Sequence, residues 1–177
     1  MRRLSSTVVV VAGQGADKVV AGLGGLHNVR AVVAGERDPA DLSALAAHSS
    51  STYVVHDGDP LAGVRDAWVD FFDRAAPPGG LEVAIESALA DLRAERALLP
   101  DYYVVLDPEE MPETLRHWWL GVLAGAAPAR VVPAPASTSA VRDVLSHLTA
   151  GRWWPSDLDG WLRALPKVVP DQAGVRP

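Results

Sequence analysis

Several features that would identify a protein class are missing from this sequence of 177 residues. The absence of cysteine excludes disulfides, thiolate zinc sites and a cysteine nucleophile. No apolar run reaches the roughly 20 residues that a membrane-spanning helix needs. The stretch Met1-Arg2-Arg3 is basic through its two arginines, but the apolar stretch after it is too short for a secretory signal peptide. We therefore expect a cytoplasmic protein that has no membrane partner.

Basic residues are few and scattered. The chain has 16 Lys and Arg against 22 Asp and Glu, which gives a formal net charge of −6. Binding to nucleic acid relies on clustered Lys and Arg that neutralise phosphates, so nucleic acid is not an expected partner. The Gly-x-Ser-x-Gly turn of serine hydrolases and a His-x-x-x-His pair for zinc are also absent. The sequence therefore leaves open whether the protein is an enzyme.

What the chain does have is a regular alternation of apolar, β-branched runs with helical patterns. Such alternation is typical of a parallel sheet with helices on both faces. We expect a three-layer, Rossmann-like α/β fold with a mainly parallel five-stranded sheet in the strand order 2-1-3-4-5. The expected strands span residues 7–12, 29–34, 52–56, 102–106 and 130–133. The expected helices span residues 16–26, 39–48, 60–74, 81–99, 139–150 and 157–165, with a further helix that begins near Pro112.

Residues 1–150 are expected to form this α/β domain, and residues 151–177 form a segment rich in Trp and Pro. The short helix predicted in this segment has one apolar face, which must be buried on the domain or on a partner. A homodimer or protein partner is therefore a candidate, and a non-catalytic protein-interaction domain is an alternative function. The contact residues would be Trp153, Trp154 and Trp161.

Ligands of parallel sheets lie beyond the carboxyl ends of the strands, so the loops there are candidate sites. Glycines in the first loop would let backbone N–H groups approach a phosphate at a helix N-terminus. The hydroxyls that follow the fifth strand would provide a second anion contact. We therefore predict that the ligand is a nucleotide or another phosphate-bearing small molecule, although a tight turn and a helix cap explain the same residues. The predicted ligand-binding residues are Gly13, Gln14, Gly15, Ser137, Thr138 and Ser139, together with Asp57.

Asp57 and Asp59 follow the third strand and are candidate Mg²⁺ ligands, because that ion prefers carboxylate oxygens. An Asp before Pro is also a common helix start, which explains Asp59 but not Asp57. Asp107 recurs in the same setting, and Glu110 three residues later predicts a capping box. His56 and His117 are candidate acid–base groups, since imidazole titrates near neutral pH.

Residues from about 8 to 72 resemble a Toprim domain of the bacterial primase type. Gly13 and Gly35 follow the first two strands, and the stretch from Asp57 to Gly63 is similar to the Asp-Gly-Asp-x-Ala-Gly motif of that family, with one extra residue. Ala12 stands where the family has its catalytic Glu. The resemblance therefore implies a degenerate Toprim-like domain that binds Mg²⁺ through Asp57 and Asp59.

Overall fold

The computed structural model describes residues 6–35, 37, 39–73, 79–149 and 154–169. Its centre is one sheet of five strands, and every neighbouring pair of strands is parallel. The α/β fold with a five-stranded parallel sheet is thereby confirmed. The strands are β1 (Thr7–Ala12), β2 (Val29–Val32), β3 (Tyr53–His56), β4 (Tyr102–Leu106) and β5 (Val131–Ala134).

The strand order is 2-3-1-4-5, so the predicted order 2-1-3-4-5 is wrong. β1 lies at the centre, between β3 and β4, and β3 separates it from β2. A central strand is covered on both faces and both edges, which favours the most uniformly apolar run in the chain. β1 provides that run, because its four consecutive valines, Val8 to Val11, are completely buried.

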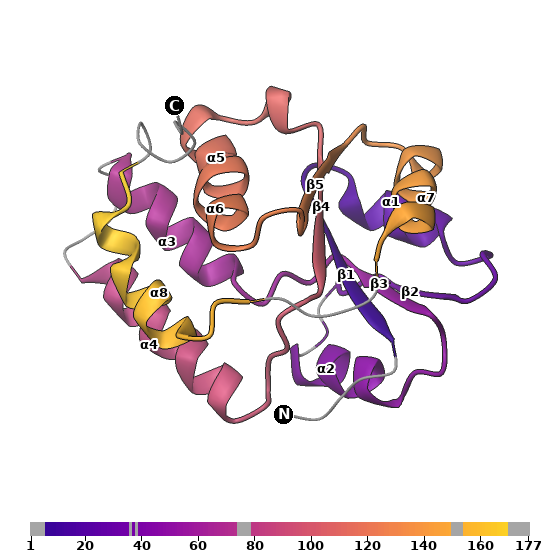
Figure 1. Ribbon diagram of the computed structural model, residues 1–177, viewed down its shortest axis with the longest axis horizontal. Coiled ribbons are helices and arrows are strands. Elements are labelled where there is room, and N and C mark those ends of the chain that lie inside the picture. The colour runs from indigo at the N-terminus through magenta and orange to yellow at the C-terminus, as the bar shows by residue number, and fades with distance from the viewer. Residues whose placement is uncertain (1–5, 36, 38, 74–78, 150–153, 170–177) are drawn as a thin grey trace.

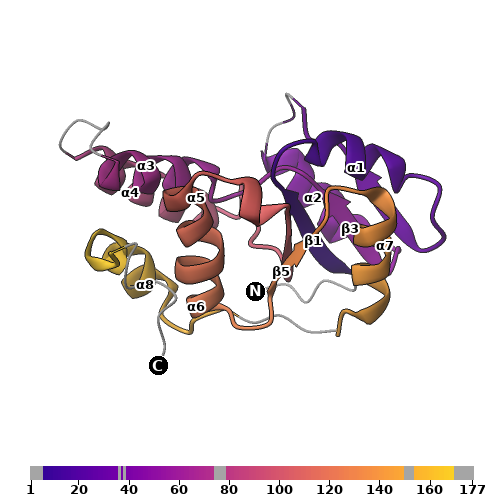
Figure 2. The same cartoon turned by 90° about the horizontal axis from the view of Figure 1, so that it is seen from above.

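The helices form a layer on each face of the sheet (Figures 1 and 2). α1 and α7 lie side by side on one face, while α3, α4 and α8 lie on the other (Figure 1). The helices are α1 (Ala16–Gly22), α2 (Pro39–His48), α3 (Ala62–Phe72), α4 (Gly80–Arg93), α5 (Glu113–His117), α6 (Ala124–Ala126), α7 (Thr138–His147) and α8 (Leu158–Ala164). Shorter turns are η1 (Pro108–Glu110), the π-helical η2 (Trp118–Leu123) and η3 (Leu165–Lys167).

Alternate residues of the strands supply the two cores. Val9 and Val11 of β1 pack in the core beneath α1 and α7. Val10 packs on the opposite face, in the core that includes residues of α3, α4 and α8. Val8 lies on that second face as well, in a small cluster with Ala46 of α2. This alternation places α2 and α3 on the same face as the side chain of His56, two residues after Val54 in β3.

The largest differences from the predicted helix ends are at α1 and α4. α1 ends at Gly22 rather than at residue 26, and α4 ends at Arg93 rather than at residue 99. Glu95 has a φ of 55°, a left-handed conformation that no α-helix can continue through. The predicted start near Pro112 is confirmed, because α5 begins at Glu113.

Residues 154–169 of the C-terminal segment pack on the rest of the chain. Leu162 and Leu165 are completely buried, in the same core as the sheet residue Tyr103. The Trp68 indole N–H donates to the Leu165 carbonyl at 3.2 Å, and ion pairs join α8 to α4 through Arg93–Asp159 and Arg163–Glu86. The apolar face predicted for this segment is therefore covered within the chain. Trp154 and Trp161 are half-buried, while Trp153 lies outside the described residues.

Within the described ranges, we find no helix that combines the length and the apolar character needed to cross a membrane.

Candidate functional site

A cavity of about 370 Å³ lies on the α2 face, at the carboxyl ends of β2 and β3. Polar residues line it where the strands end, namely His56, Asp57 and Asp59. Its other walls come from α2, from the first turn of α3 and from the loop before β4, and they are largely apolar. These walls include Ala34, Leu42, Ala46, Pro60, Ala62, Ala97 and Leu98, while Gly35, Arg37, Ser43 and Gly58 complete the lining.

His56 is a buried wall residue of this cavity, with only 5% of its surface exposed. Its Nδ1 atom is buried and has no hydrogen-bond partner. Burial lowers the pKa of His56 to about 4, against the opposing effects of the Asp57 carboxylate and a hydrogen bond with the Gly58 backbone. The imidazole is therefore neutral at pH 7.

Gly58 brings the backbone close to both His56 and α2. A Cβ atom at this position would lie 2.5 Å from Leu42 Cδ1 and 3.6 Å from His56 Nδ1. Leu42 and His56 both line the cavity. Position 58 is therefore crowded, and a side chain there would clash with Leu42.

Asp57 joins the ends of two neighbouring strands. Its Oδ1 atom accepts a hydrogen bond from the Ala34 backbone N–H at 2.6 Å, two residues after β2 ends. This contact explains structurally the acid that helix capping did not explain. Asp57 is half-buried and lines the cavity, so the carboxylate combines a structural contact with access to that space.

Asp59 sits in a dense network of donors, and its side chain is only 5% exposed. Oδ1 accepts from the Tyr103 hydroxyl and from the Leu61 backbone N–H, both at 2.9 Å. Oδ2 accepts from Arg65 at 3.0 Å. Burial raises the pKa of Asp59, and Arg65, the Leu61 N–H and Tyr103 oppose that rise. Burial and the Asp59 charge in turn raise the pKa of Tyr103 well above its ordinary value.

Arg65 is held by more than this ion pair. Its guanidinium lies 5.7 Å from the ring centroid of Trp119, within the range of a cation–π contact. It also donates to the exposed Asp66 at 2.8 Å. Asp59 and Arg65 therefore neutralise each other beside the cavity, and Asp57 remains its carboxylate without an ion-pair partner among the described residues.

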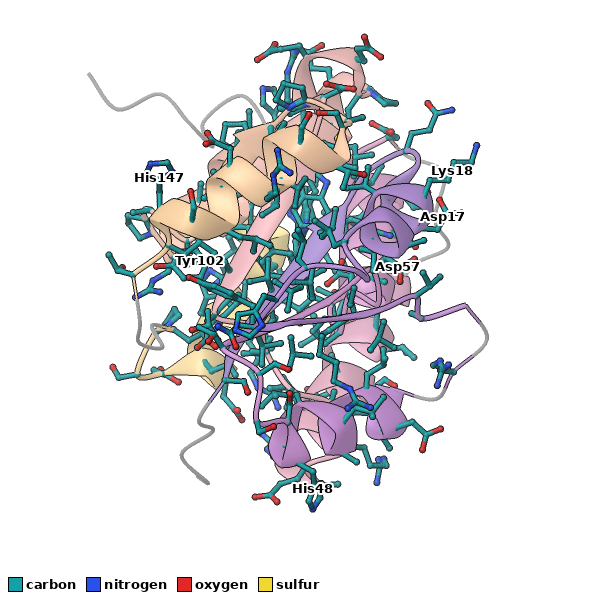
Figure 3. The ribbon with its side chains drawn as sticks, turned by 90° about the vertical axis from the view of Figure 1, so that its right-hand side faces the viewer. Asp17, Lys18, His48, Asp57, Tyr102 and His147 are labelled. Carbon is teal, nitrogen blue, oxygen red and sulfur yellow. The ribbon has the colours of Figure 1, made fainter. Side chains whose placement is uncertain are left out.

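The first loop lies outside this cavity. Gly13 has a φ of 120°, and a Cβ there would lie 2.9 Å from the Leu106 carbonyl oxygen and 3.2 Å from Met111 Cε. The glycine is thus required by a close approach of β1 to the end of β4. The first turn of α1 is closed by bonds from Ala16 N to the Gly13 carbonyl and from Val19 N to the Gly15 carbonyl. Asp17 and Lys18 project outward from α1 (Figure 3).

The hydroxyl-rich loop after β5 is also separate from the cavity. Ser137 caps α7 by accepting from the Ala140 N–H at 3.2 Å, and its hydroxyl lies 3.2 Å from that of Ser139. Thr138 packs closely against Gly22, the last residue of α1. One of the three hydroxyls therefore has the capping role, and phosphate binding here stays a prediction, as it does for Gly13, Gln14 and Gly15.

The predicted capping box at Asp107 is wrong. Asp107 makes no side-chain cap on the turn that follows it, and its Oδ1 atom accepts from the Ala136 N–H at 3.1 Å. The carboxylate reaches across to the end of β5, and the Asp107 backbone has a left-handed φ of 40°. Asp107 therefore makes a tertiary hydrogen bond to Ala136 in place of the predicted local cap.

The two predicted magnesium ligands line one cavity, but three of their four carboxylate oxygens already accept hydrogen bonds. Asp59 accepts from three donors, and Asp57 accepts from one. Across the described ranges, no group of three or more His, Asp or Glu side chains could hold a metal ion. Mg²⁺ requires near-octahedral oxygen coordination. The described side chains alone therefore do not complete a magnesium site, and the assignment of Asp57 and Asp59 as ligands stays a prediction.

Sequence reasoning identified the polar end of the cavity but missed its other walls. Arg37 follows β2, in a carboxyl-end loop that the site prediction passed over although the rule for parallel sheets applies to it. Leu42 and Leu98 gave no signal of their own, because they come from α2 and from the loop before β4. His117, the other histidine considered, does not line the cavity and has a buried Nδ1 atom without a partner.

Comparisons with protein-family models, with curated proteins and with solved structures found no significant match. The resemblance to Toprim domains therefore stays a prediction. What the site can do follows from its own residues: a neutral imidazole, a half-buried carboxylate and apolar walls enclose a space of about 370 Å³. This combination suits binding of a small, partly apolar molecule that has hydrogen-bonding groups.

Proposed function

We propose that this protein binds a small molecule of the nucleotide class, and that the ligand occupies the cavity beside His56. The observation that carries the proposal is the cavity itself, which is lined by the half-buried Asp57 carboxylate and by largely apolar walls. Small-molecule sites combine largely apolar walls with a few polar groups that orient the ligand, and the lining of this cavity has that character.

The position of the cavity supports the same proposal. Ligands of open parallel sheets lie beyond the carboxyl ends of the strands, and this cavity lies at the ends of β2 and β3. Its volume of about 370 Å³ falls within the usual range for small-molecule sites. The Trp-rich segment offers weaker support for a protein-interaction function, because the apolar residues Leu162 and Leu165 are already covered within the chain.

Thermal unfolding in the presence of ribonucleosides, ribonucleotides, sugar phosphates and Mg²⁺ tests the proposal. A ligand that binds only the native state raises its melting temperature. We expect at least one organic compound to do so, and we expect Ala62→Leu to abolish the shift, because Ala62 lines the cavity and a larger side chain would fill it.

Ala90→Leu is the matched control. It makes the same substitution on α4, at an exposed position that does not line the cavity. We expect this variant to keep the full shift. A panel without any stabilising compound, or a shift that survives Ala62→Leu, would contradict the proposal.

A further inference from the structure

Trp154 of the C-terminal segment is tied to a wall of the cavity that it does not itself line. Its indole N–H donates to the Pro100 carbonyl at 2.8 Å. Pro100 is buried and lies two residues after Leu98, which lines the cavity together with Ala97. The C-terminal segment therefore contacts the loop before β4 that forms this wall.

Hydrogen bonds hold this loop at both ends, but few hold its middle. On one side, the Ala97 N–H donates to the Asp91 carbonyl at 3.3 Å. On the other side, the Asp101 N–H donates to β1 at 2.7 Å. Between these anchors, residues 98–100 make one hydrogen bond with the described part of the chain, and Trp154 is its donor. The position of the wall therefore depends on this indole.

The side chains of the loop show from which side Trp154 acts. Leu98 packs with the small cluster around Ala46 of α2, another residue of the cavity lining. Leu99 packs in the core that also contains Trp154. Trp154 therefore holds the backbone from the core side, while Leu98 faces α2 and the cavity.

A second wall of the cavity is tied to Trp154 through Tyr103. The ring centroids of Tyr103 and Trp154 lie 6.3 Å apart. The Tyr103 hydroxyl donates at 2.9 Å to Oδ1 of Asp59, which lines the cavity. Both ties meet at one side chain. We propose that Trp154 is a positioning residue of the cavity, which holds the Leu98 wall in place relative to Asp59.

A single introduced thiol can report on this wall, because the chain has no cysteine of its own. In Leu98→Cys, the rate of alkylation by iodoacetamide measures how readily the thiol leaves the wall. Trp154→Phe removes the N–H donor and keeps an aromatic ring beside Tyr103. We expect it to raise the alkylation rate at position 98 roughly three- to tenfold, the factor that corresponds to the loss of one hydrogen bond.

Trp68→Phe is the matched control for overall stability. The Trp68 indole donates to the Leu165 carbonyl at 3.2 Å in the same core, so this variant loses the same kind of hydrogen bond away from the loop. It leaves the contact of Trp154 with Pro100 in place, and we expect the alkylation rate at position 98 to stay within twofold. No increase in Trp154→Phe, or an equal increase in Trp68→Phe, would overturn the inference, because the wall would then respond only to global unfolding.

The inference rests on the proposed function where it concerns ligand binding. Isothermal titration calorimetry uses the nucleoside, nucleotide or sugar phosphate that raises the melting temperature most. We expect Trp154→Phe to bind it about threefold or more weakly, because a displaced wall lowers the fraction of protein that is competent to bind. Trp161→Phe makes the same substitution in the same segment, on a ring 6.1 Å from Trp154 that is not the donor to Pro100. Its affinity should stay within twofold of the original protein, and an unchanged affinity in Trp154→Phe would overturn the inference.

The two proposals fail in different ways. If no compound raises the melting temperature, the proposed function is overturned, and the alkylation rates still decide whether Trp154 positions the wall. If a compound gives a shift that Ala62→Leu abolishes but alkylation at position 98 is the same with Trp154 and with Phe, the cavity is a ligand site and only the role of Trp154 is overturned.

Discussion

Asp57 and Asp107 make the same contact on opposite sides of the central strand. Each is the first residue after its strand, β3 or β4, and each accepts the backbone N–H of the second residue after the neighbouring edge strand. Asp57 accepts from Ala34 at 2.6 Å, and Asp107 accepts from Ala136 at 3.1 Å. Both edge strands are therefore tied to the inner sheet by a carboxylate at their carboxyl ends.

Removal of either carboxylate should destabilise the protein. Asp57→Ala leaves the Ala34 N–H without its acceptor, and Asp107→Ala does the same to Ala136. We expect each to lower the free energy of unfolding by about 1–3 kcal/mol, measured by urea denaturation. Asp57→Asn should cost less, because its amide oxygen can still accept from Ala34. Asp70→Ala, at an exposed position on α3, is the control, and an equal loss there would contradict the assignment.

The ion pair of Asp59 and Arg65 should show strong coupling. Arg65→Met leaves a buried carboxylate without its cation, and we expect a loss of roughly 2–3 kcal/mol. The value lies below that of fully buried pairs because the Arg65 side chain is 21% exposed and solvent screens its charge. The double variant Arg65→Met with Asp59→Asn should recover part of the loss. Additive losses in this double-mutant cycle would argue against the coupling.

The strands were predictable because their signal is local. Four successive valines in β1 and the Tyr-Tyr-Val-Val-Leu run of β4 bury both faces, and both strands have the predicted bounds. The lateral order was not predictable in the same way, since the connections between these strands are long enough to reach more than one neighbour. The uniform burial of Val8 to Val11 was the signal for a central strand.

The site was predictable only at the strand ends. Asp57 follows a strand in the sequence, and its position there marked it as a candidate. The walls opposite it come from α2 and from the segment around Leu98, which tertiary packing brings together. The capping prediction for Asp107 was wrong for a related reason. The donor that its carboxylate binds, Ala136 N–H, is 29 residues away, and no local sequence pattern indicates a donor at that separation.

Burial of His56 should make the protein less stable in acid. Burial lowers its pKa to about 4 from 6.5, so between these values the unfolded chain binds a proton that the folded chain does not. The contribution of neutral His56 to the free energy of unfolding is fully present above pH 6.5. It is lost as the pH falls toward 4, by roughly 3 kcal/mol in total. Asp59 has the opposite effect: burial raises its pKa, so its contribution to stability grows as the pH falls.

Urea denaturation at pH 7 and pH 5 separates these contributions. His56→Gln removes the histidine and leaves Asp59 in place, so its loss of stability between the two pH values should be smaller than in the original protein. His27→Gln removes an exposed histidine and should keep the original difference. Equal pH dependence in the protein and in His56→Gln would show that this imidazole does not resist protonation.

The C-terminal segment should be needed for folding of the domain. Leu162 and Leu165 are completely buried, and the Trp68 N–H relies on the Leu165 carbonyl. A chain that ends at Gly151 exposes the core around Trp68, and we expect it to lose the cooperative thermal transition. Leu162→Ala should cost about 2–5 kcal/mol through the cavity that it leaves. Val83→Ala is the control, because Val83 is 71% exposed.

Light scattering on the full chain then tests the homodimer prediction for this segment. The face formed by Leu162 and Leu165 is already buried within one chain, so a second copy is not needed to cover it. We expect a monomer whose truncated form is unfolded. A dimer that dissociates into folded monomers on truncation would instead place the segment between two copies, through the half-buried Trp154 and Trp161.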